Sequence, residues 1–238
     1  MSDRGSSAPS LRWIFVAWLA IGLTFVTYIV FGMIERGDPT EAIERLFGDS
    51  ALFAFLVYTA GLVFALLVLR RLLRRSGFGW RDVGLRGRLT GRGALFAVGG
   101  WFVAFWLYYL VEKTTGAVGL RMFWNEEAFF GLHSVARVIG IGLSTLVIAP
   151  VAEEIIYRGY LIPAIRAKAG TALAVLLSSL IFASVHIGIG PGMAIYIFLG
   201  AFIPAYLFLR FDNIYPCILM HLINNMVAYF VIPLAVGA

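Results

Sequence analysis

The stretch SVARVIGIGLSTLVIAPVAEEIIYRGYLIPAI, residues 134–165, decides the fold of this chain. As an α-helix its 32 residues would be about 48 Å long, which exceeds the ~30 Å hydrocarbon core of a bilayer. Glu153, Glu154 and Arg158 interrupt this apolar run. Because ionisable groups are costly inside a membrane, these three side chains indicate a functional site on a membrane helix.

The whole composition is typical of a polytopic membrane protein. The chain has 238 residues, of which 61% are hydrophobic and 13% charged, whereas soluble domains average about 25% charged residues. We therefore predict an all-α membrane bundle of about seven to eight transmembrane helices. Residues 1–10 are expected to form a disordered cytoplasmic tail, and 11–238 a single domain with a motif-bearing core at 134–235. The predicted spans are 12–34, 51–69, 93–111, 134–165, 171–187, 193–209 and 214–235.

Charge in the loops predicts the orientation. Segment 70–92 holds eight Arg and one acid, whereas segment 35–50 holds five acids and two Arg. Arg and Lys in short loops mark the cytoplasmic side, so we place 70–92 and the N-terminus in the cytoplasm, and the plasma (inner) membrane follows if the source is bacterial. The net charge of +6 favours anionic lipid headgroups over nucleic acid as the partner. The single Cys217 excludes an intrachain disulfide.

Polar residues on three predicted helices can meet at one depth. Glu153 precedes Lys168 by 15 residues and His186 follows it by 18, so an antiparallel pair that turns near Lys168 brings Glu153 and His186 to similar depths. His221 and Asn225 are four residues apart and share one helix face. Carboxylate, imidazole and amide groups together are typical of hydrolysis by an activated water.

The two adjacent glutamates are predicted to have different tasks. They lie about 100° apart around a helix, so Glu153 can face a cavity while Glu154 pairs with Arg158 at the favourable i, i+4 spacing. A purely structural ion pair is the simpler interpretation of Glu154 and Arg158, and a single intramembrane histidine often only joins helices. The sequence has no H-E-x-x-H, no G-x-S-x-G and no Gly-Asp pair within a span. Among hydrolytic designs, a glutamate base assisted by histidine therefore remains.

Three motifs resemble one family. They are EEIIYR at 153–158, FASVH at 182–186 and HLINN at 221–225. In order and on separate spans, they are similar to the motifs of the type II CAAX prenyl endopeptidases, also called the CAAX protease and bacteriocin-processing (CPBP, or Abi) family. The resemblance implies an intramembrane endopeptidase that cleaves membrane-associated substrates, prenylated CAAX-type proteins being one candidate. Its substrate would be a peptide or a membrane protein.

The resemblance also implies a role for each motif residue. Glu153 would be the general base, and His186 would assist it on the attacking water. His221 and Asn225 would stabilise the oxyanion, while Glu154 and Arg158 would support the site.

Two questions stay open at this stage. Glu153, His186 and His221 would also make a His₂Glu zinc site, and the family is often labelled metalloprotease. We identify no acid beside either histidine to orient a metal-bound imidazole, so we expect a metal-free mechanism with zinc as the alternative. The second question is catalysis itself, since a non-proteolytic membrane scaffold or bacteriocin-immunity protein could use the same pocket for binding. No inverted repeat supports a transporter.

Overall fold

The computed structural model describes residues 50–123 and 134–236, and within them every regular element is helical. The elements are α3 (Ser50–Arg75), α4 (Gly91–Ala117), α6 (Val135–Gly142), η2 (Leu143–Ile148), α7 (Ala149–Glu153), η3 (Glu154–Leu161), α8 (Ile162–Ser184), α9 (Pro191–Gly200), α10 (Phe202–Phe211), α11 (Tyr215–Met226), η4 (Val227–Val231) and α12 (Ile232–Val236). The three η segments are π-helical. The all-α prediction is confirmed for these residues.

Five helices in the described part of the chain are long and apolar enough to cross a membrane. They are Phe55–Arg75, Gly91–Ala117, Val135–Ser184, Pro191–Phe211 and Tyr215–Ala235. The predicted number of seven to eight is not confirmed. The predicted span 12–34 and the tail 1–10 lie outside the described residues. The predicted spans 134–165 and 171–187 both overlap the single segment Val135–Ser184.

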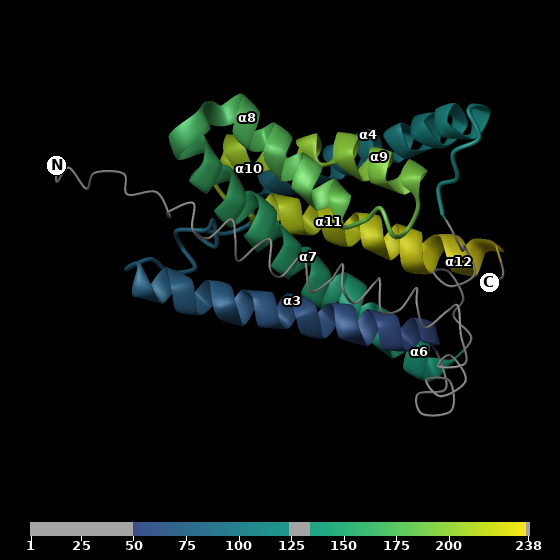
Figure 1. The fold of residues 1–238 in the computed structure, drawn as a ribbon, viewed down its shortest axis with the longest axis horizontal. Coiled ribbons are helices and arrows are strands. Elements are labelled where there is room, and N and C mark those ends of the chain that lie inside the picture. The colour runs from purple at the N-terminus through teal and green to yellow at the C-terminus, as the bar shows by residue number, and fades with distance from the viewer. Residues whose placement is uncertain (1–49, 124–133, 237–238) are drawn as a thin grey trace.

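That long segment turns back on itself at Gly170. The backbone of Gly170 leaves the helical region with φ 79° and ψ 170°, a conformation that glycine adopts without steric cost. The two arms then run side by side, as the green ribbon in Figure 1 shows, and Ser178 Oγ on the returning arm donates to Tyr157 O at 2.8 Å. The turn predicted near Lys168 is therefore present, at Gly170, and it brings 182–186 back toward Glu153.

The loops gather at two opposite ends of the bundle. At one end, the backbone N–H of Ile214 donates to Gly84 O at 3.0 Å, which ties the Arg-rich 76–90 loop to the α10–α11 connection. At the other end, Gly192 N donates to Arg121 O at 2.9 Å. The 76–90 loop and the α10–α11 connection therefore share one end of the bundle, and residues 121 and 192 lie together at the other.

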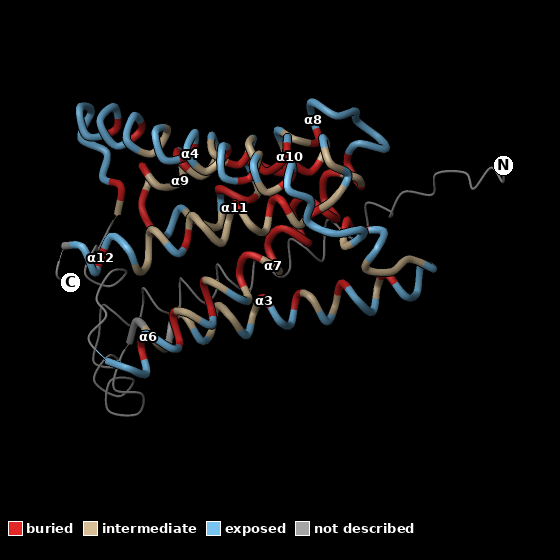
Figure 2. The backbone as a smooth tube through the Cα atoms, turned by 180° about the vertical axis from the view of Figure 1, so that it is seen from behind, coloured by how far each residue is buried: buried red, intermediate tan, exposed pale blue. Residues whose placement is uncertain are grey.

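The core lies around the π-helical segment η3, every residue of which is buried. Figure 2 shows this segment in red, whereas long stretches of α3 and α4 are exposed. The exposed side chains include large apolar ones such as Leu67, Leu95 and Trp106. An apolar exposed face is what a lipid-facing helix requires, because hydrocarbon surrounds it in place of water.

Candidate active site

Pro150 shapes the backbone that carries the two glutamates. Ala149 N–H bonds to Ser144 O, five residues back, at the end of π-helix η2. The next residue in this register would donate to Thr145 O, but Pro150 has no N–H. Thr145 O instead accepts a hydrogen bond from Asn225 Nδ2 at 2.8 Å. The proline thus creates a free carbonyl that anchors the amide of the HLINN motif, and π-helical segments lie on both sides of it.

Glu154 forms the ion pair that its spacing predicts. Its Oε1 accepts from Arg158 Nη1 at 3.0 Å, and both side chains are almost fully buried, at 1% and 2% exposure. Arg158 also donates from Nη2 to Ala201 O at 3.5 Å. Its guanidinium lies 4.5 Å from the centre of the Phe182 ring. Three segments, namely η3, α8 and the α9–α10 junction, therefore meet around one buried charge pair.

His221 connects the two glutamates, which the sequence analysis did not foresee. Nδ1 of His221 is 2.9 Å from Oε1 of Glu154, and Nε2 is 3.7 Å from Oε2 of Glu153. A carboxylate only accepts, so Nδ1 carries the donated hydrogen. Nε2 faces Oε2 of Glu153, which is also an acceptor, so a ring protonated at both nitrogens donates toward both glutamates. Adjacent carboxylates with different directions can thus share one imidazole through its two nitrogens.

Glu153 has a second partner on a helix that carries no motif. The hydroxyl of Tyr58, on α3, donates to Oε1 of Glu153. Glu153 itself is 3% exposed, so it faces the protein and not lipid. Sequence reasoning missed Tyr58 because one tyrosine in an apolar span has no distinguishing pattern. In Figure 1, α3 runs beside α6 and α7, which explains how it reaches the site.

His186 lies next to this cluster, on the other side of Phe182. Its Nδ1 donates to Phe182 O at 2.8 Å, and its ring packs edge-on against the Phe182 ring with 4.8 Å between centres. Phe182 also contacts His221, with ring centres 6.4 Å apart. In the described residues no hydrogen bond or ion pair joins His186 directly to Glu153. Phe182, to which the sequence analysis gave no role, is the common neighbour of both histidines.

The two asparagines of HLINN point to different partners. Asn225 is bound to Thr145 O, as described above, and is 8% exposed. Asn224 accepts from the hydroxyl of Tyr196 at 3.2 Å, which joins α11 to α9. Asn224 therefore connects helices, whereas Asn225 lies on the same side as His221 and the glutamates.

The donor chemistry, but not the spacing, fits a zinc ion. Both histidines hold Nδ1 against an acceptor, Glu154 Oε1 for His221 and Phe182 O for His186. Metal-bound histidines commonly use the second ring nitrogen in this way. The expectation that no acid lies beside either histidine is therefore wrong. However, no group of three or more His, Cys, Asp or Glu side chains in the described residues is close enough to hold a metal ion.

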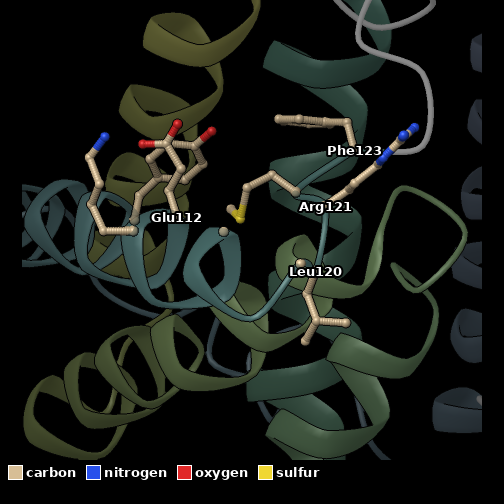
Figure 3. A pocket seen from close by; sticks show the side chains of 9 residues that line it. Glu112, Leu120, Arg121 and Phe123 are labelled. Atoms are coloured by element: carbon tan, nitrogen blue, oxygen red, sulfur yellow. The ribbon is translucent and has the colours of Figure 1, made fainter.

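A separate cavity lies at the end of α4. Its volume is about 740 Å³, and its lining includes Glu112, Lys113 and Arg121 together with Leu120 and Phe123. Figure 3 shows Glu112 on one side of the cavity and Arg121 and Phe123 on the other. None of the motif residues lines it, so it is distinct from the carboxylate–imidazole site.

Fold and site together define an all-helical membrane protein with a buried carboxylate–imidazole cluster. Residues 135–227 match the family model described as type II CAAX prenyl endopeptidase Rce1-like. This match contains all three motifs and confirms the resemblance predicted from them. The chain is also 29% identical over 215 residues to a Bacillus subtilis (strain 168) protein described as "Putative membrane peptidase YdiL". The alignment covers 89% of this chain and 81% of that protein. No solved structure matches significantly. The comparisons support a membrane protease.

Proposed function

We propose that this protein is an intramembrane endopeptidase in which Glu153 activates the attacking water. The observation that carries the proposal is the placement of Glu153 Oε2, 3.7 Å from Nε2 of His221, with the imidazole fixed from behind by Glu154. A carboxylate and an imidazole at this separation can both reach one water molecule or one reacting carbonyl. Their burial excludes bulk solvent, which strengthens electrostatic interactions in the site.

The proposed reaction uses one proton cycle. Glu153 takes a proton from water as the water oxygen attacks the scissile carbonyl, and it later gives this proton to the amine that leaves. In the neutral ring of His186, Nε2 is the accepting nitrogen. In the proposal it assists Glu153 in activating the attacking water. Asn225 Nδ2 carries two hydrogens, of which one binds Thr145 O. In the proposal the other donates to the oxyanion, together with the protonated ring of His221.

The proposed substrate is a membrane-associated peptide or protein, with prenylated CAAX-type proteins as the class suggested by the family match. The test uses purified protein in liposomes with a prenylated CAAX peptide and the same peptide without the lipid. Mass spectrometry then identifies the cleaved products. Membranes that contain wild type or Glu153→Gln are compared in parallel for new protein C-termini, because the true substrate need not be prenylated. If wild type produces no cleavage in either assay, a scaffold or immunity protein becomes the better interpretation.

We propose a metal-free reaction, with zinc as the alternative. To hold zinc, Glu153, His186 and His221 would have to come closer together than they are in the structure, and the ion would then supply Lewis-acid activation of the scissile carbonyl. Glu154 and Phe182 O would then orient the two imidazoles, as they do in the structure. The role of Glu154 is the same in both mechanisms, since it fixes the ring of His221.

The proposed orientation places the N-terminus and the 70–92 loop in the cytoplasm of a cell whose plasma (inner) membrane contains the protein. Arg74 and Arg75 in the last turn of α3 and Arg81 in the loop that follows are exposed. They are suited to contact anionic lipid headgroups.

A further inference from the structure

Helix α3 lies outside residues 135–227, yet it supplies a direct partner of the proposed base. The Tyr58 hydroxyl donates to Oε1 of Glu153, while Oε2 of the same carboxylate faces Nε2 of His221. The two oxygens of Glu153 therefore have different neighbours, one on α3 and one on α11. A carboxylate held in this way cannot rotate freely about its last torsion, which is otherwise broad for glutamate.

The position of Tyr58 is fixed by close docking of α3. The neighbouring Thr59 Oγ1 donates to Ser144 Oγ on η2 at 2.8 Å. One turn further along α3, Leu62 packs against Ala149 and Ala152 of α7. Small side chains on α7 let the two helix backbones approach closely, and this brings the phenol within reach of Glu153.

A second close approach lies nearer the N-terminal end of α3, where this helix contacts α6. A Cβ atom on Gly140 would stand 2.2 Å from Cδ1 of Leu52, so α3 and α6 touch where only a glycine fits without a shift of that side chain. Leu52, Thr59 and Leu62 recur at helical spacing along one side of α3. The phenol of Tyr58 is thus presented by a helix that is docked on both sides of it.

We propose that Tyr58 is a positioning residue for the reaction, acting through Glu153. By donating to Oε1, it occupies one oxygen of the base and leaves Oε2 as the atom that accepts the proton of the attacking water. The inference rests on the proposed function, and it extends the active site beyond the three motifs to a helix of the N-terminal half. It also gives α3 a role that apolar composition alone does not indicate.

The test compares Tyr58→Phe with the matched control Thr59→Val. Each substitution removes one hydroxyl from adjacent residues of α3 and breaks one hydrogen bond to the 135–161 segment. Only Tyr58→Phe removes a bond to Glu153. Liposome assays with a substrate peptide give kcat and KM per folded protein, and thermal unfolding gives Tm for both variants and for Glu153→Gln.

We expect Tyr58→Phe to lower kcat by about 10–100-fold, the usual effect of losing a group that orients a reacting residue, with KM almost unchanged. Thr59→Val should keep the wild-type kcat even if its Tm falls as much as that of Tyr58→Phe. Equal kcat values for the two variants, or a Tyr58→Phe that does not fold while Thr59→Val does, would overturn the inference and leave Tyr58 as a structural residue. A wild type without any cleavage would instead overturn the proposed function, and this inference with it.

Discussion

Nδ1 of His221 lies 2.9 Å from Oε1 of Glu154. The same oxygen binds Nη1 of Arg158 at 3.0 Å. The ion pair and the imidazole are therefore parts of one buried network, and a change in the ion pair reaches the ring of His221 directly. Glu153 meets this network only at Nε2 of His221, 3.7 Å away, and its other oxygen binds Tyr58. The two adjacent glutamates should therefore respond differently to substitution.

Glu154→Gln should lower both the folded yield and the activity, whereas Glu153→Gln should abolish activity while the protein still folds. Removing one partner of a buried pair leaves an uncompensated charge, here on Arg158, and typically costs about 3–5 kcal/mol. Folded yield and Tm in detergent, measured beside peptide cleavage, separate the two effects. Equal Tm values with equal losses of activity would contradict this division of roles.

Asn225→Ala should reduce kcat by about 10²–10³-fold, the usual effect of losing one oxyanion donor, with little change in substrate affinity. It also leaves Thr145 O without the bond that the structure shows. Asn224→Ala is the control, because Asn224 Oδ1 accepts from the Tyr196 hydroxyl and its Nδ2 donates to Asn225 Oδ1 at 3.5 Å, whereas only Asn225 binds Thr145 O. The measurement is kcat and KM for both variants. A similar kcat loss in the two would argue against an oxyanion role for Asn225.

Regular helix geometry accounts for the parts of this site that could be predicted from sequence. The i, i+4 spacing of Glu154 and Arg158 is sufficient to predict their ion pair, and similar distances from a turn near Lys168 are sufficient to bring 182–186 back toward Glu153. Both arguments need only helix periodicity and one turn. The three motifs likewise predict the family match at 135–227.

The remaining contacts depend on tertiary geometry that periodicity does not contain. The π-helical register around Pro150 decides that Thr145 O is free to bind Asn225. The docking of α3 decides that Tyr58 reaches Glu153. A hydroxyl in an apolar helix shows no pattern until its partner is known, so sequence reasoning had no signal for Tyr58.

Gly159→Ala should destabilise the protein by about 1–3 kcal/mol, the range typical of overpacking. A Cβ atom at this position would lie 2.1 Å from Val83 O, a backbone atom that cannot turn aside. The Arg-rich loop would have to withdraw from η3. Gly99→Ala is the control, because its Cβ would meet nothing within 4 Å and alanine favours a helix over glycine. Thermal unfolding of both variants is the measurement, and an unchanged Tm for Gly159→Ala would refute the close approach.

Arg81→Cys should react with a membrane-impermeant maleimide only after the cytoplasmic face is exposed, since the loop that carries it has the excess of Arg. Arg81 is exposed, whereas the native Cys217 is buried and should not react with the maleimide. Intact cells and inverted vesicles are labelled in parallel, with the unsubstituted protein as the control for Cys217. Labelling from outside intact cells would reverse the proposed orientation of the whole bundle.

Protein stripped of metal should retain its activity if Glu153 acts as a metal-free base. The arrangement of the two histidines makes this a stringent test. Nδ1 of His221 and Nδ1 of His186 each face an acceptor, as the second ring nitrogen of metal-bound histidines commonly does. Three measurements decide between the two mechanisms. They are elemental analysis of the purified protein, activity after chelation and dialysis, and activity after zinc is added back. Chelator inhibition alone is not sufficient, because a chelator can bind in a polar cavity. His221→Ala offers a second readout, since a zinc site would lose bound metal in this variant whereas a metal-free site has none to lose. Stoichiometric zinc, loss of activity on stripping and recovery on reconstitution would make Glu153, His186 and His221 ligands and would replace the glutamate-base mechanism.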